Sequence, residues 1–140
     1  MDHHTEVDRL TTRATCGQAL IVIRQGLFNF FQDKQGAKAN VFVNDCDQDV
    51  ALSVFLLSHG EFVAKTANFL LDRLVNVSDR LDTTSGMDPL LDDKALGEMA
   101  WIYSPYKEFR LSGNLDRKNA EEYVSIIQLI EGRIMKYLTG

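Results

Sequence analysis

Residues 40–58, NVFVNDCDQDVALSVFLLS, combine a short apolar run, a polar turn and a longer apolar run. The run at 41–43 has strong β-propensity, and the polar residues 44–49 are too rich in turn formers to continue a strand inside a core. Asp47 or Asp49 suits the start of a helix, because a carboxylate accepts backbone N–H bonds at the positive end of the helix dipole. These residues therefore predict a short buried strand, an acidic turn and an apolar helix.

Helical patterns dominate the rest of the chain. Apolar residues recur at spacings of three and four over 61–81 and over 117–138, which predicts two amphipathic helices. Asp88 followed by Pro89 predicts the start of another helix, which we expect to end before Pro105.

Other parts of the chain are less regular. Residues 18–31 fit either a strand with a short helix or one helix, because a continuous apolar run does not separate the two. We expect a loop over 104–114, SPYKEFRLSGN, and a cap for the last helix at Asp116. His59 suits the end of the apolar helix, and residues 1–16 suit a mobile start.

The predicted fold class is α/β and helix-rich, with a small sheet of few strands packed by about four to five helices. An all-α helical bundle is the alternative. A chain of 140 residues with 45% hydrophobic and 25% charged residues has the size and composition of one globular domain, over residues 1–140. A chain of this length buries about 68% of its unfolded surface, which is enough for a core without metals or disulfides.

Composition also bounds the function. Cys16 and Cys46 are lone thiols outside any CxxC or Cys/His cluster, which favours reduced cysteines in a cytoplasmic protein. The N-terminus is polar and partly acidic, unlike a signal or transit peptide. No apolar run approaches the roughly 18 residues that span a bilayer, so we expect no membrane association. A net charge of -5 makes nucleic acid an unlikely partner.

The acidic turn is the main candidate for chemistry. Asp45, Asp47 and Asp49 occupy alternate positions and offer hard oxygen ligands of the kind that bind Mn²⁺, Mg²⁺ or Ca²⁺. An EF-hand is excluded, because Val50 stands where that loop needs glycine and Leu56 where it needs glutamate. The aspartates also have a purely structural interpretation, in which they cap a buried helix and keep the turn solvated.

The segment NDCDQDVALSVFLL resembles the D-x-D strand, turn and helix of DHH-type phosphoesterases over about twenty residues. The resemblance implies Asp45, Asp47 and Asp49 as ligands of Mn²⁺ or Mg²⁺ in phosphoester hydrolysis or in binding a phosphorylated small ligand. That family has an internal Asp-His-His loop, whereas the triplet here stands at residues 2–4.

The segment VFVNDCDQD is also similar to the motif of haloacid-dehalogenase-like phosphatases. This second resemblance implies Asp45 as nucleophile and Asp47 as acid/base. Asp49 stands where that family has Thr or Val, and Asp92 with Asp93 would imitate its later acidic pair.

Two classes of function follow from these patterns. In the first, the acidic turn binds a metal and Arg110, in a loop beside glycine, grips the phosphate with its planar guanidinium. In the second, the chain is a noncatalytic helical interaction protein, as a homo-oligomer or with a protein partner, through the apolar stripe of 61–81 or 117–138. Asp79 and Asp82 lie one helical turn apart and could add ligands to such a site, but an exposed polar face is the simpler expectation for them.

Overall fold

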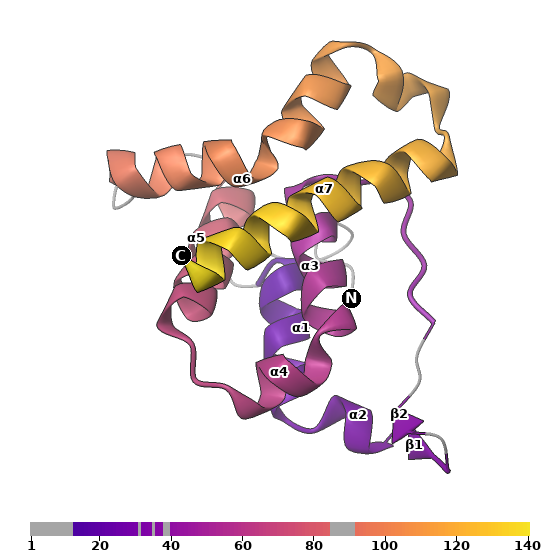
Figure 1. The fold of residues 1–140 in the computed structure, drawn as a ribbon, viewed down its shortest axis with the longest axis vertical. Helices are drawn as coiled ribbons and strands as arrows, with labels where there is room; N and C mark the ends of the chain where they lie inside the picture. Colours follow the sequence, from indigo (N-terminus) through magenta and orange to yellow (C-terminus); the bar gives the residue numbers. More distant parts are fainter. Residues whose placement is uncertain (1–12, 31, 35, 38–39, 85–91) are drawn as a thin grey trace.

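Helices form almost all of the regular structure in this computed structural model, which describes residues 13–30, 32–34, 36–37, 40–84 and 92–140 (Figure 1). They are α1 (Thr15–Arg24), α2 (Leu27–Phe30), α3 (Gln48–Ser58), α4 (Gly60–Lys65), α5 (Phe69–Thr83), α6 (Asp93–Leu111), the 3₁₀ turn η1 (Asn114–Arg117) and α7 (Ala120–Thr139). The described residues also form one antiparallel pair of two-residue strands, β1 (Gln32–Asp33) and β2 (Gly36–Ala37). The fold is all-helical, so the predicted α/β class is wrong and its all-α alternative is correct.

The predicted buried strand at 41–43 is also wrong. This segment lies outside every helix and strand of the described chain and runs alone along one side of the helices (Figure 1). Phe42 is 92% exposed, and Val41 and Val43 are 47% and 41% exposed. High β-propensity reflects how well a side chain fits into a sheet, and no described strand pairs with residues 41–43 to form one.

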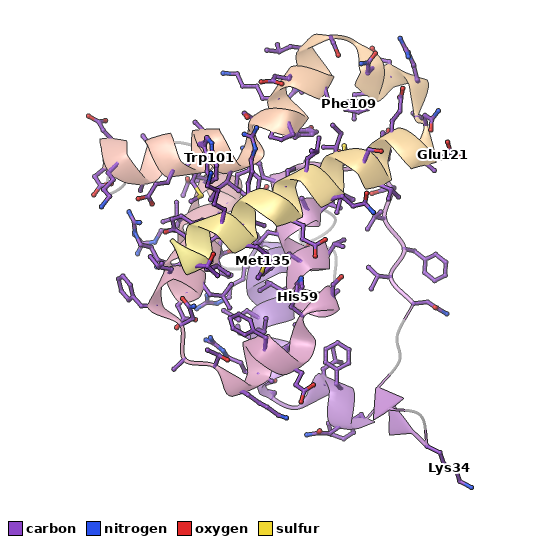
Figure 2. All side chains as sticks on the ribbon, viewed as in Figure 1. Lys34, His59, Trp101, Phe109, Glu121 and Met135 are labelled. Atoms are coloured by element: carbon purple, nitrogen blue, oxygen red, sulfur yellow. The ribbon has the colours of Figure 1, made fainter. Side chains whose placement is uncertain are left out.

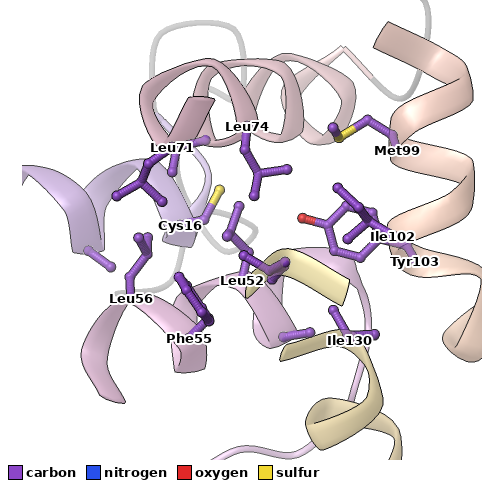
Figure 3. Close-up of a cluster of buried hydrophobic side chains, with 14 of the residues drawn as sticks. Cys16, Leu52, Phe55, Leu56, Leu71, Leu74, Met99, Ile102, Tyr103 and Ile130 are labelled. Atoms are coloured by element: carbon purple, nitrogen blue, oxygen red, sulfur yellow. The ribbon is translucent and has the colours of Figure 1, made fainter. Parts of the chain in front are cut away.

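Helix α1 occupies the centre of the fold and packs against α3, α4 and α5 (Figure 1). The sequence leaves residues 18–31 open between strand and helix; their described part, 18–30, lies in α1, a turn and α2. The turn contains Gly26 with a φ of 93°, a left-handed conformation that glycine adopts without strain. Buried side chains from five helices meet around α1, among them Cys16, Leu52, Phe55, Leu56, Leu71, Leu74, Met99, Ile102, Tyr103 and Ile130 (Figure 3).

The single helix expected over 61–81 is two helices. Helix α4 ends at Lys65, Thr66 has extended backbone, and α5 begins at Phe69. Asn68 caps α5, since its side-chain oxygen accepts the Leu71 N–H at 3.1 Å. A good capping residue inside an apolar pattern therefore restarts the helix in a new direction.

Helix α6 continues through Pro105, where the sequence predicted its end, and the loop expected over 104–114 is helical as far as Leu111. Its N-cap is Asp92, whose Oδ1 accepts the Ala95 N–H at 2.7 Å. The start expected at residues 88–89 lies outside the described residues, as does most of the mobile start expected over 1–16.

A contact from α7 explains how α6 accommodates its proline. Pro105 has no N–H to donate to the carbonyl of Trp101, one turn earlier, and the helix bends (Figure 1). The Arg133 guanidinium donates hydrogen bonds to that carbonyl and to Ser104 Oγ, and lies 5.4 Å from the centre of the Trp101 ring. Trp101 itself lies on α6 beside α7 (Figure 2). Arg133 therefore replaces the donor that the proline removes.

Helix α7 matches its predicted apolar stripe but not its predicted cap. Asn119 Oδ1 accepts the N–H groups of Glu121 and Glu122, whereas Asp116 lies in η1. The buried face consists of Tyr123, Ile127, Ile130, Ile134 and Leu138. None of the described helices is long and apolar enough to cross a membrane.

We expect Arg133→Met to lower the free energy of unfolding by about 1 kcal/mol, because the Trp101 carbonyl loses its donor. Lys136→Met is the matched control, since Lys136 lies 6.0 Å from the centre of the same ring without a hydrogen bond to that carbonyl. Urea denaturation measures both variants. Equal losses in the two would show that the charge near the ring matters and the hydrogen bond does not.

Candidate functional site

Asp47 begins α3 as its N-cap. Its Oδ1 accepts the Val50 N–H at 2.9 Å, which confirms the predicted capping role. Burial raises the pKa of Asp47 and the Val50 N–H lowers it; the carboxylates of Asp45, Asp49 and Asp82 raise it further. Negative charge is therefore concentrated around Asp47.

Asp49 points away from the turn and caps a different helix. Its Oδ1 accepts the Cys16 N–H at 2.8 Å, and its Oδ2 accepts the Thr15 N–H at 3.1 Å. These amides belong to the first turn of α1, whose own N-cap residue, Ala14, provides no side-chain acceptor. Asp49 is 8% exposed, so its carboxylate serves the buried end of α1.

Asp79 of α5 completes this cap from the other side. Its Oδ1 accepts the Ala14 N–H at 2.5 Å, and its Oδ2 lies 3.6 Å from the Arg13 guanidinium. A Cβ at Gly17 would lie 3.3 Å from the Asp79 carboxyl group, so the glycine permits the close approach. Because Asp79 is 8% exposed, its predicted place on an exposed polar face is wrong.

The three aspartates of the turn thus have separate partners. Asp45 Oδ1 accepts the Cys46 N–H at 2.7 Å, while Asp47 and Asp49 cap different helices. Within the described ranges, no group of three or more His, Cys, Asp or Glu side chains is arranged to hold a metal ion. A metal site built from Asp45, Asp47 and Asp49 therefore stays a prediction.

Both cysteines are free and buried. Burial raises the pKa of the Cys16 thiol far above its usual range, with Asp49 adding to the shift. For Cys46, burial followed by the charges of Asp45 and Asp47 raises the pKa to about 11. The raised pKa values disfavour the thiolate, which is the reactive form of cysteine, at neutral pH.

A surface hollow of about 450 Å³ lies where α3, α5 and α6 meet. Its lining residues are Asp47, Gln48, Asp49, Ser78, Leu81, Asp82, Tyr106 and Arg110. Arg110 lies in the last turn of α6, not in the predicted loop. The structure nevertheless brings it to the same hollow as Asp47 and Asp49, two of the predicted metal ligands.

Ser78 and Tyr106 are lining residues that sequence reasoning missed. Each lies four positions before another lining residue, Asp82 on α5 and Arg110 on α6, so each pair shares one helix face. That spacing would have revealed the second pair if residues 104–114 had been assigned to a helix. Burial raises the pKa of Tyr106, and Asp45 and Asp47 raise it further, so its phenol stays protonated and can donate a hydrogen bond.

Comparison with known proteins gives no relative. No family model, curated protein or solved structure matches this chain. The chemistry of the hollow is therefore inferred from its own residues.

We expect Asp79→Ala to lower the free energy of unfolding by about 1–3 kcal/mol, because the buried Ala14 N–H loses its acceptor. Asp79→Asn should lose less, since the amide oxygen still accepts that bond. The control is Asp116→Ala, at an exposed position in η1. Urea denaturation of the three variants tests the cap, and a loss no larger at Asp79 than at Asp116 would contradict it.

Proposed function

We propose that the hollow between α3, α5 and α6 binds a phosphorylated small ligand together with Mg²⁺ or Mn²⁺. The observation that carries the proposal is the convergence of Asp47, Asp82 and Arg110, which lie far apart in the sequence, on one hollow. Carboxylates on one part of the lining suit a divalent cation, and a guanidinium on another suits a phosphate.

The cation does not require a closed cage of protein ligands. Mg²⁺ is commonly held by one or two carboxylates together with phosphate oxygens and water. Asp47 and Asp82 supply two carboxylates. Burial is the main cause of the raised pKa of Asp47, and a bound cation would offset the charges of Asp45, Asp49 and Asp82 that raise it further. Asp49 stays with α1, so this arrangement differs from a triplet of the three turn aspartates.

The anion contacts come from α6. Arg110 is exposed, and among the described residues it forms no ion pair. Its planar fork matches two phosphate oxygens, and the Tyr106 hydroxyl offers another donor one turn away. The ligand class rests on this guanidinium, because residues 41–43 do not form the strand on which the resemblance to DHH-type phosphoesterases depends.

The alternative function, a noncatalytic helical interaction protein, was suggested by the apolar stripes of 61–81 and 117–138. Most of those stripes are used inside the fold. Val124, Leu129 and Met135 of α7 are exposed. The residues buried in the core of this chain are Tyr123, Ile127, Ile130, Ile134 and Leu138 of α7, with Leu71, Leu74, Val75 and Val77 of α5. Those faces stabilise the fold and are not exposed to a partner.

We expect Mn²⁺ with inorganic phosphate to raise the unfolding temperature of the wild-type chain, because a ligand that binds only the folded state stabilises it. Asp47→Asn should weaken Mn²⁺ binding about tenfold or more in calorimetry while keeping the α3 cap, since Asn and Asp cap helices equally well. Asp92→Asn makes the same change at the cap of α6, outside the hollow, and should leave binding unchanged. The proposal fails if wild type does not respond, or if the two variants respond alike.

Cation affinity should also depend on pH. Asp47 must lose its proton to bind a metal, and its raised pKa means that protonation begins at a higher pH than the usual 3.8 would give. Mn²⁺ affinity should therefore fall as the pH is lowered from about 7 towards the carboxylate range. Calorimetry across this range should show less pH dependence in Asp47→Asn than in wild type. An affinity independent of pH in wild type would exclude Asp47 as a ligand.

A further inference from the structure

Residues 40–44 are exposed and lie outside every described helix and strand, with β-type side chains at 41–43 and a backbone bend at Asn44. No backbone hydrogen bond joins them to another described residue. Phe42 is 92% exposed, and its apolar neighbours Val41 and Val43 are exposed as well. A segment whose N–H and C=O groups have no backbone partner among the described residues, and whose side chains include β-branched valines, can pair with another strand.

The sequence of this segment is a palindrome, Asn-Val-Phe-Val-Asn. In an antiparallel pair of two such segments centred on Phe42, each Val41 lies opposite a Val43 and each Asn40 opposite an Asn44. Valine therefore meets valine, phenylalanine meets phenylalanine, and the two asparagine pairs can exchange side-chain hydrogen bonds. Pairing of identical surfaces about a twofold axis is the geometry of a closed dimer.

We propose that residues 40–44 pair with the same residues of a second copy of this chain, as a two-stranded antiparallel ladder. The proposal is independent of the ligand proposed for the hollow. The register also separates like charges. In each copy Asp45 lies three residues from Phe42, and the two Asp45 residues lie on opposite sides of the twofold centre. At 3.3–3.4 Å per residue they are about 20 Å apart. The acidic turn therefore does not oppose association through Coulomb repulsion at close range.

A pair of five-residue strands gives a weak dimer, because two short strands on their own are marginally stable in water. Association should therefore appear in a concentration series that reaches the upper micromolar range. Analytical ultracentrifugation of the full chain measures the monomer–dimer equilibrium directly.

Phe42→Lys should weaken the dimer about tenfold or more, because it places two like charges opposite each other at the centre of the pair. Phe69→Lys is the matched control, since Phe69 is also a highly exposed phenylalanine, at 77%, but begins α5. A wild-type chain that stays monomeric throughout the series overturns the proposal. So does an equal loss of association in both variants.

Cysteine cross-linking tests the register. Phe42→Cys should give a disulfide-linked dimer on mild oxidation, because a residue at the twofold centre faces its own copy. Asn40→Cys should cross-link with Asn44→Cys when the two variants are mixed, and much less with itself. Cross-linking of Asn40→Cys alone at the level of the mixture would overturn the register. The native cysteines, Cys16 and Cys46, are fully buried and should not compete.

Discussion

The capping of α1 by carboxylates from two other helices is the interaction on which the rest of the structure depends. The first-turn N–H groups of any helix lack intrahelical partners, and burying them without acceptors costs several kcal/mol in total. Here Asp49 from α3 and Asp79 from α5 accept the N–H groups of Ala14, Thr15 and Cys16. The central helix can therefore start inside the protein, and the same bonds fix α3 and α5 relative to it.

This constraint also shapes the candidate site. Since Asp49 faces α1, it cannot share the role of Asp47, which remains at the edge of the hollow with Asp82 and Arg110. The ligand proposed here thus depends on residues brought together by helix packing more than on the acidic turn alone. The carboxylates of Asp45, Asp47 and Asp49 in the turn each accept hydrogen bonds from different backbone amides.

Local patterns predicted α3 with a cap at Asp47 or Asp49, and the buried face of α7, because helix periodicity and capping depend on nearby residues. Long-range contacts decided the rest. The acceptor role of Asp49 involves amides 33 and 34 positions away, and α6 passes Pro105 because Arg133 of α7 supplies a donor. The 41–43 strand failed as a prediction because β-propensity does not say whether a partner strand is present. Because α6 continues past Pro105, Arg110 lines the hollow from a helix and not from the predicted loop.

Native-state hydrogen exchange of the first-turn amides of α1, followed by NMR, tests the central claim most directly. The N–H groups of Thr15 and Cys16 have no acceptor within their own helix, so they should be protected only if Asp49 holds them. The account predicts protection close to that of Ala19 in the middle of α1. Exchange as fast as that of Asp93 and Lys94, the corresponding amides at the exposed start of α6, would contradict it.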